Sequence, residues 1–504
     1  MIKVIKEVSK KEFKDFLYTI DLTDQNLYEE LNEERALSVF QFSGGTAEGL
    51  TRRIKPKDFE EMCVVNSAAR PGTIDFVDDY INSRDKKENK YPKVVQDVLS
   101  DSYGCCFYQE QIMSIFNKIG GFSLEETNEV RSLMKKLGKA EKKKSDLDRW
   151  EEVVNQFEEG AVNKGITKEE AKLVADDLLK MSAYSFNKSH AVAYTYIAMM
   201  NLYLSYYFKP YYFSSVLSYE ASKEENLKEK LNACKLQNFN VLPPDINKSK
   251  IHFHPDNGSI RFGLNEVKFV GDVPATKIVN MQPFTSFSDF ITKIQGERIT
   301  KTTINALVSV GAFDSLIGNE RTKNIFILEQ FIERKKTTKI AEKLSALWET
   351  IENEASRIPG LETTGNNLAE YEEKFLGFNF FNTLFTDRII QKINMAYRRG
   401  LCGRTFSDLT KFQSSMPIPV IIDKLRAFND KNGKEMAFLE CVDMLGKSYN
   451  IPMFQNVWKL VKDKVLAKKV FILNFYINDE DKIMFGAKKF TNDEEKKRMV
   501  RKIE

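Results

Sequence analysis

The polar segment from Tyr184 to His190 carries the side chains of this sequence that are best suited to binding a nucleotide. It places the amide of Asn187, the cation of Lys188, the hydroxyl of Ser189 and the imidazole of His190 beside two aromatic residues. Such a set can stack on a base and bind the attached phosphates. A polar turn in front of a buried helix is the alternative, and the chemistry of the segment favours the binding site.

The densest basic stretch of the chain begins at Arg131 and ends at Lys144. Arg131 and Lys135 are four residues apart, so on a helix they share a face. The other cations of the stretch, set against the single acid Glu141, are Lys136, Lys139, Lys142, Lys143 and Lys144. Such a cluster can bind a triphosphate or a DNA backbone. A solvated helix face explains these residues equally well when they are considered alone.

Three carboxylates, those of Asp75, Asp78 and Asp79, suggest a site for two metal ions, because such sites need converging carboxylates. Acidic residues also favour the N-termini of helices, and we interpret this group as the start of a solvated helix. The three histidines of the chain are too few for a histidine-rich metal site. Phosphate-binding glycine loops, dinucleotide fingerprints, serine nucleophile motifs and metalloprotease helix motifs are absent from the sequence.

The elements that position these residues are predicted to be mainly helical. From residue 27 to about residue 220, apolar residues recur at three- and four-residue spacing, which predicts one large helical unit. A short β-hairpin follows, with its turn at Asn257-Gly258. Small helices return over residues 287–331. Residues 334–367 are charged and poorer in apolar side chains, which predicts a linker or exposed helices.

The C-terminal part alternates apolar and polar residues, as strands do. Strands are predicted over residues 418–428, 436–442, 448–454, 469–477 and 482–485, with a short helix over 455–465 between the third and fourth. Three strands, a helix and two strands is the order of an OB-fold barrel, which commonly binds single-stranded nucleic acid. The candidate platforms for stacking bases are Phe428, Phe438, Tyr449, Phe454 and Trp458.

Composition indicates a globular protein of several domains. The chain has 504 residues, of which 42% are hydrophobic and 29% are charged. The net charge of +4 provides no global basic field, so any nucleic-acid surface must be local. Six cysteines without a C-x-x-C pair indicate reduced thiols and a cytoplasmic location. The uncharged stretch 191–208 contains five tyrosines and several polar residues, which favours a buried helix over a membrane span.

These residues form part of a longer pattern that resembles the alpha subunit of bacterial DNA polymerase III, the C family of replicative polymerases. The resemblance begins near Ile20 and continues, with gaps, to the barrel. It is carried by residues 38–42 (SVFQF), 70–72 (RPG), 77–81 (VDDYI), 103–104 (YG), 108–113 (YQEQIM), 184–190 (YSFNKSH), 193–194 (AY), 242–247 (LPPDIN) and 311–314 (GAFD). The order and spacing of these segments are far more specific than any one of them.

The resemblance implies a nucleotide pocket. In the family, the segment matching 184–190 lines the pocket for the incoming nucleotide, and the basic helix matching Arg131 helps to hold the triphosphate. The family has a second arginine where this chain has Ser132, and a glycine where it has Ser185. The residues implied to contact the nucleotide are Arg131, Lys135, Lys136, Tyr184, Asn187, Lys188, Ser189 and His190.

The resemblance also implies DNA contacts. The turn at Gly311 resembles a helix-hairpin-helix module, which holds the backbone of duplex DNA through amide donors, and the C-terminal barrel resembles the OB domain of the family. The acidic group at Asp78 and Asp79 matches a non-catalytic part of the fingers. The residues expected to contact DNA are Lys139, Lys142, Lys143, Gly311, Phe428, Phe438, Tyr449 and Trp458.

The palm domain of the family, with three catalytic aspartates, would precede residue 20. We therefore expect the chain to be one part of a split polymerase of a phage or an AT-rich bacterium, or a fragment. We expect it to be inactive alone and completed by a separate palm-bearing chain that holds Mg2+. The other expected ligands are primer-template DNA, the dNTP substrate and a sliding clamp, although no convincing clamp-binding peptide is found between residues 313 and 375. A non-catalytic DNA-binding protein derived from a polymerase is the alternative.

The expected fold class is a multidomain chain with mainly helical fingers and helix-hairpin-helix regions, followed by a small β-barrel. The expected divisions are a lead-in (1–19), the fingers (20–240), a duplex-binding region with the helix-hairpin-helix (241–335), a linker with helices (336–404), the OB-fold domain (405–490) and a charged tail (491–504). No membrane segment is expected.

Overall fold

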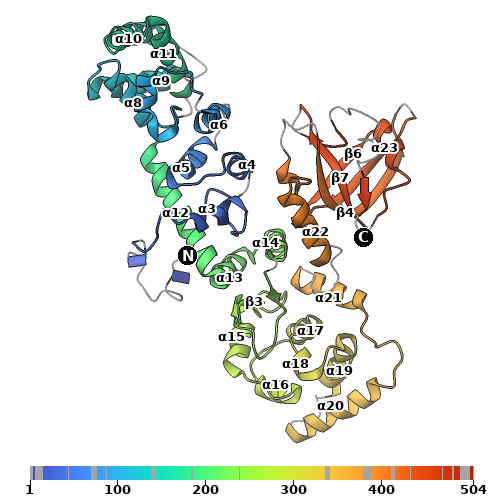
Figure 1. Cartoon of the computed structure of the whole chain (residues 1–504). Helices are drawn as coiled ribbons and strands as arrows, with labels where there is room; N and C mark the ends of the chain where they lie inside the picture. Colours follow the sequence, from blue (N-terminus) through green and yellow to red (C-terminus); the bar gives the residue numbers. More distant parts are fainter. Residues whose placement is uncertain are drawn as a thin grey trace. The chain divides into compact units, whose positions relative to one another are not determined.

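The computed structural model describes residues 4–5, 15–16, 18–43, 45–69, 76–86, 88–137, 143–182, 185–237, 239–334, 341–377, 387–409, 415–431, 433–467, 469–479, 482–487 and 500–502. The chain divides into two compact units, residues 1–209 and residues 210–504. The first unit is helical and the second combines helices with two sheets (Figure 1). All six cysteines are buried and free, which agrees with their interpretation as structural thiols.

Helices build the first unit. Several begin at a side-chain cap, as where the Asp58 carboxylate accepts a hydrogen bond from the Glu61 amide at 2.8 Å. In the described parts of the chain, no helix is long and apolar enough to cross a membrane. The elements are α3 (Gln25–Asn32), α4 (Gly45–Ile54), α5 (Phe59–Ala68), α6 (Val77–Lys86), α7 (Lys93–Val98), η2 (Ser100–Ser102), α8 (Gln109–Lys118), α9 (Leu124–Leu137), α10 (Lys144–Val162), α11 (Lys168–Ser182) and α12 (Lys188–Tyr207).

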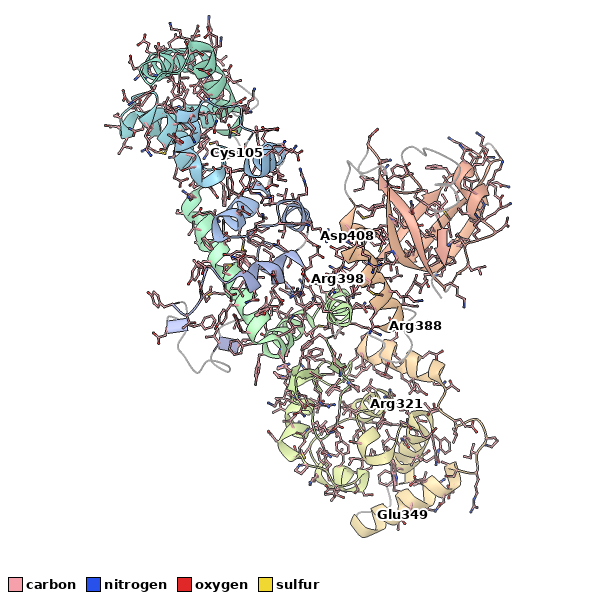
Figure 2. The ribbon with its side chains drawn as sticks, viewed as in Figure 1. Cys105, Arg321, Glu349, Arg388, Arg398 and Asp408 are labelled. Carbon is pink, nitrogen blue, oxygen red and sulfur yellow. The ribbon has the colours of Figure 1, made fainter. Side chains whose placement is uncertain are left out.

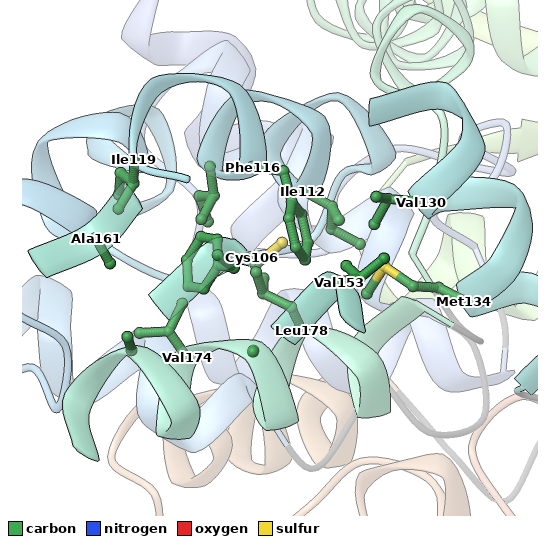
Figure 3. Packing of buried hydrophobic residues seen from close by; sticks show 14 of the residues in the cluster. Cys106, Ile112, Phe116, Ile119, Val130, Met134, Val153, Ala161, Val174 and Leu178 are labelled. Carbon is green, nitrogen blue, oxygen red and sulfur yellow. The ribbon is translucent and has the colours of Figure 1, made fainter. Parts of the chain in front are cut away.

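A large core of the first unit lies between α8, α9, α10 and α11 (Figure 3). Phe116 makes ring contacts with Phe157 and Trp150, at centroid distances of 5.0 and 6.3 Å. Helix α10 approaches the end of α8 so closely that a Cβ on Gly160 would lie 2.2 Å from the Gly120 carbonyl oxygen. This packing fixes the orientation of α8 and α9, the two helices that carry Gln109 and Arg131.

The second unit begins with helices and a small three-stranded sheet. In that sheet β3 lies between β1, which is parallel to it, and β2, which is antiparallel. The predicted hairpin turn is confirmed, because Asn257 and Gly258 join β2 to β3 with φ of 48° and 79°. The elements are α13 (Lys209–Glu220), α14 (Glu224–Leu236), β1 (Val241–Leu242), β2 (His254–Asp256), β3 (Ser259–Arg261), α15 (Asp272–Met281), α16 (Phe287–Lys293), α17 (Lys301–Ser309), α18 (Asp314–Ile317), α19 (Arg321–Arg334), α20 (Ala341–Ala355), α21 (Gly365–Leu376), α22 (Asp387–Arg398) and η4 (Phe406–Asp408).

A nearly closed antiparallel barrel forms the C-terminal part of the second unit. Its strand order is β6-β5-β4-β7-β8, and β6 lies close to β8. The predicted order of three strands, a helix and two strands is confirmed, and with it the predicted fold class. Strand β9 (Val500–Lys502), which pairs with β7, was not predicted. The other elements are β4 (Met416–Asn429), β5 (Glu435–Val442), β6 (Ser448–Met453), α23 (Gln455–Val461), β7 (Lys469–Ile477) and β8 (Ile483–Phe485).

Helix α20 lies in the charged stretch for which a linker or exposed helices were predicted, and one face of it is buried. Trp348 of α20 is buried, and its ring lies 4.2 Å from that of Phe287 and 5.6 Å from that of Phe331, measured between centroids. Ile351 and Ala355 are buried as well. These apolar residues pack α20 against α16 and α19.

Candidate nucleotide site and nucleic-acid interfaces

The predicted nucleotide segment is fixed against the start of α8 by backbone hydrogen bonds. The Phe186 amide donates to the Phe107 carbonyl oxygen, and the Gln109 amide donates to the Phe186 carbonyl oxygen, both at 2.9 Å. These bonds form a parallel bridge between Tyr108 and Phe186. The segment before α12 therefore has a defined position beside α8. Tyr184, the first residue of the predicted set, lies outside the described residues.

Asn187 begins α12 as its N-cap. Its side-chain oxygen accepts from the His190 amide at 2.9 Å and from the Ser189 hydroxyl at 2.6 Å. The carboxylate of Glu110 accepts from the Asn187 amide group at 2.7 Å and from the Lys188 backbone amide at 3.0 Å. An anion thus already lies at the positive end of α12, where phosphate groups also bind favourably.

The Lys188 side chain lies among acids. Its ammonium donates a hydrogen bond to Asp101, lies 3.4 Å from the Glu60 carboxylate and sits 5.4 Å from the centre of the Tyr108 ring. Partial burial, the largest single effect, lowers the pKa of Lys188, but the hydrogen bond and charge of Asp101 with the charge of Glu60 outweigh it. The pKa is therefore raised, and Lys188 stays a cation at neutral pH.

A row of aromatic rings continues from the same segment along α12. Ring centroids are 5.1 Å apart for Phe186 and His190, 4.0 Å for His190 and Tyr194, and 5.2 Å for Tyr194 and Phe40. His190 and Phe40 are exposed. Phe40 and Tyr194 were not among the predicted site residues. The four-residue spacing of His190 and Tyr194, which places them on one face of a helix, was the available signal.

Arg131 is joined to the segment through one side chain. Its guanidinium donates to the Gln109 side-chain oxygen at 3.2 Å, and the Gln109 amide group donates to the Ser185 carbonyl oxygen at 3.3 Å. Lys135 and Lys136 are exposed in the last turn of α9, and Lys143 is exposed where α10 begins. Lys139 and Lys142 lie outside the described residues. The structure thus brings Arg131 beside the 185–190 segment.

The acidic residues of α6 lie at the start of that helix, as interpreted from the sequence. Asp78 pairs with Arg53 at 2.5 Å, and Asp79 lies 3.6 Å from the Lys90 ammonium. Asp75 lies outside the described residues. Within the described ranges, no group of three or more histidine, cysteine, aspartate or glutamate side chains could hold a metal ion.

Gly311 occupies a buried turn in the second unit. Its amide donates to the Val308 carbonyl oxygen at 3.0 Å. A Cβ at this position would lie 2.1 Å from Nη2 of Arg321, which is labelled in Figure 2. The Arg321 guanidinium pairs with Asp314 at 2.9 Å and with the buried Glu372 at 3.3 Å. Because the Gly311 amide is buried and already bonded, we do not retain this residue as a DNA contact. Its glycine is explained by packing and by its φ of 81°.

The barrel exposes some of the predicted aromatic platforms and buries others. Phe428 and Phe438 are 39% and 36% exposed, and their rings are stacked at 5.3 Å with an interplanar angle of 8°. Phe454 is 52% exposed. Tyr449 is partly buried with its ring 4.1 Å from that of Phe406. Trp458 is only 4% exposed and belongs to the barrel core, so it has no free face on which a base could stack.

Two cations lie on the same face of the barrel as the exposed ring pair. Arg426 is paired across the strands with Phe438, and Lys424 is two residues before it on β4. Both side chains are mostly exposed, and both approach Glu440 on β5. A β-bulge between Ile422 and Lys424 turns this end of β4 outward. The surface therefore combines a stacked aromatic pair with two cations and one acid.

Comparison with known proteins confirms the resemblance for two regions of the chain. Residues 1–165 match the model of the bacterial DNA polymerase III alpha subunit finger domain, and residues 238–323 match a helix-hairpin-helix motif. DNA polymerase III subunit alpha of Aquifex aeolicus is 29% identical over 98% of this chain and 41% of its own length. The corresponding proteins of Campylobacter jejuni and Bacillus subtilis are 28% and 27% identical, over 96% and 89% of this chain. The chain spans about two fifths of the length of these curated relatives.

Proposed function

We propose that this chain supplies the fingers and the DNA-binding portion of a replicative DNA-directed DNA polymerase. The observation that carries the proposal is that Arg131, which lies in the region similar to a polymerase finger domain, is joined through Gln109 to the segment 185–190 that carries Lys188 and His190. Such a group of residues suits a nucleoside triphosphate, because cations can bind its phosphates and an aromatic ring can stack on its base.

In this function each group has a specific task. Arg131 and Lys188 stabilise the triphosphate, whose charge is redistributed during nucleotidyl transfer. Lys135 and Lys136 add positive charge on the same helix. The exposed His190 ring and the half-buried Tyr194 ring stack on a base. Lys188 must exchange its contact with Asp101 for phosphate oxygens, and the Glu110 carboxylate must withdraw from the start of α12 for phosphate to bind there.

The catalytic carboxylates are proposed to come from a palm region outside residues 1–504. The family resemblance implies two-metal chemistry with Mg2+, in which the ions activate the attacking oxygen and stabilise the leaving one. The described residues offer no cluster for those ions. The chain would therefore extend a primer only together with a palm-bearing partner, and the purified chain alone would be inactive.

The remaining surfaces are proposed to hold the DNA. The helix-hairpin-helix region contacts the duplex, and the stacked pair Phe428 and Phe438 on the barrel binds the unpaired strand. Primer-template DNA is thus the proposed nucleic-acid ligand, and a sliding clamp is a proposed further partner. We locate no clamp-binding peptide.

A second candidate function is a DNA-binding protein without a nucleotide site. The ion pairs of Lys188 with Asp101 and Glu60 favour it, because they already neutralise the central cation of the segment. Fluorescence anisotropy with labelled primer-template DNA and the full chain tests the shared part of both proposals. We expect saturable binding that weakens steeply as salt rises. Absence of binding, even with a palm-bearing partner present, would refute both functions.

A further inference from the structure

A strained turn precedes α15 in the region similar to a helix-hairpin-helix motif. The Val270 amide donates to the Val267 carbonyl oxygen at 2.9 Å, which closes a four-residue β-turn. Phe269 is the third residue of this turn and has φ of 69°. A positive φ at this position defines a type II turn, in which glycine is the residue that fits without a steric penalty. A phenylalanine here is therefore held in a conformation it does not prefer.

The surrounding structure fixes the backbone of Phe269 but leaves its ring in solvent. Thr303 of α17 donates its hydroxyl to the Phe269 carbonyl oxygen at 3.0 Å, and the Lys268 amide donates to the Phe375 carbonyl oxygen at 2.8 Å. The Phe269 ring is nevertheless 60% exposed, with an edge contact to Phe375 at 6.0 Å. Backbone strain at Phe269 does not bury its ring, so the strain does not stabilise the fold. Strained residues of this kind cluster at binding sites, which indicates that the ring contacts a ligand.

The residues next to the ring have the character of a DNA contact. Val273, in the first turn of α15, is 67% exposed and extends the apolar surface. Lys268 adjoins Phe269 in the turn, and the exposed Lys301 lies in the first turn of α17, whose Thr303 is bonded to Phe269. Asp272 is the exposed acid at the start of α15. A projecting apolar group, with one cation next to it in the turn and another on the helix bonded to that turn, is typical of proteins that insert an apolar wedge into the minor groove while binding the flanking phosphates.

We propose that Phe269 places its ring in the minor groove of duplex DNA, against deoxyribose and base edges, while Lys268 and Lys301 face the flanking phosphates. This inference rests on the proposed function, in which the helix-hairpin-helix region holds the duplex part of primer-template DNA. It assigns the contact to the turn at residues 267–270 rather than to the turn at Gly311, and it explains why a phenylalanine occupies a position that suits glycine.

Replacing Phe269 by glycine in the full chain tests the proposal, because it separates stability from binding. Phe269→Gly removes the strain, so the melting temperature should rise. Affinity for a fluorescent DNA duplex should fall about tenfold, the order expected for one lost aromatic contact to a base. The slope of log affinity against log salt should stay unchanged, because the ring is neutral, whereas Lys268→Ala should reduce it by about one. Phe269→Tyr should keep the affinity of the natural chain.

Tyr219→Ala is the matched control, since Tyr219 is another exposed ring of the second unit, and it should leave duplex affinity within about twofold. Duplex affinity of Phe269→Gly equal to that of the natural chain would overturn the inference and leave the proposed function standing. A fall in both melting temperature and affinity would also overturn it, because the ring would then be structural. Absence of duplex binding by the natural chain would contradict the proposed function itself.

Discussion

The ammonium of Lys188 is hydrogen bonded to the carboxylate of Asp101, a residue 87 positions earlier in the chain. A triphosphate has to displace this carboxylate before it can contact Lys188. Removing the acid should therefore help the nucleotide to bind. We expect Asp101→Asn to lower the KM for dNTP about fivefold in the enzyme reconstituted with its palm, since one charge near a protein surface is worth about 1 kcal/mol or more at contact distance.

The matched control for this variant is Asp97→Asn, which removes an exposed acid paired with Lys93 on α7. It should not change the KM for dNTP. If Asp101→Asn raised the KM instead, Asp101 would act by holding Lys188 in position, and the proposed competition between carboxylate and phosphate would be incorrect.

Lys188→Ala and Arg131→Ala should each reduce turnover per nucleotide on the order of a hundredfold, because fixed cations at a transferring phosphoryl group stabilise the transition state. Affinity for primer-template DNA should change little, since many other cations remain. Single-turnover primer extension at limiting dNTP measures the effect, with Lys93→Ala as a control for loss of an exposed lysine. Rates equal to those of the natural chain would remove both residues from the nucleotide site.

Gly311→Ala should destabilise the second unit rather than weaken DNA binding selectively. The new Cβ would meet the buried Arg321 guanidinium at 2.1 Å, and φ at this position is 81°. Gly296→Ala is the control, because φ there is 84° but no atom lies within 4 Å of a Cβ. Strain alone should cost about 1 to 2 kcal/mol. In thermal unfolding, a drop for Gly311→Ala no larger than for Gly296→Ala would contradict the packing explanation.

In the barrel, sequence patterns predicted the strands but not which side chains the later part of β4 exposes. Alternation along residues 418–428 predicted a strand, and Ile418, Val420 and Ile422 of that strand are all buried. Continued alternation would also bury Phe428, but the bulge after Ile422 reverses the direction of the later side chains. The alternation of a strand does not reveal an inserted residue. The exposure of the aromatic rings could therefore not be predicted from the sequence.

In the first unit, the ion pairs of the candidate site could not be predicted from the sequence. Local spacing predicted that Asn187 and its neighbours precede a buried helix, and Asn187 caps α12. It could not predict that Glu110, Asp101 and Glu60 would converge on Lys188, because these contacts join residues distant in sequence. Sequence therefore indicated candidate cations for the proposed site, while the acids that pair with them could be found only from tertiary packing.

The affinity of the chain for single-stranded DNA should depend on the stacked rings of Phe428 and Phe438 on the barrel. Phe428→Ala and Phe438→Ala should each weaken binding of a labelled oligonucleotide about tenfold, the loss expected for one stacking platform. Trp458→Ala should instead destabilise the barrel by about 3 to 5 kcal/mol, because it leaves a cavity in the core. Unchanged oligonucleotide affinity in both phenylalanine variants would rule out this face as the single-strand site.

Barrel stability should depend on pH through Asp443. Burial raises the pKa of this carboxyl to about 6, from an ordinary value of 3.8, although the amides of Leu445 and Lys447 bond to it. The folded chain then binds more protons than the unfolded chain between these values. The contribution of this group to stability should be fully present below about pH 4 and be lost as pH rises to about 6, by up to about 3 kcal/mol. Thermal unfolding measures this pH dependence, and the Asp443→Asn variant should not lose stability between about pH 4 and 6. A variant with the same pH profile as the natural chain would contradict the role of Asp443.

Single-nucleotide primer extension tests the central claim most directly. The assay compares the purified chain, a palm-bearing polypeptide from the same source, and the two together, with primer-template DNA, dNTP and Mg2+. We predict extension only by the mixture, because the chain provides nucleotide and DNA contacts while the palm provides the metal-binding carboxylates. Extension by this chain alone, or a mixture no faster than the palm polypeptide alone, would contradict the claim that the chain supplies the fingers of a polymerase.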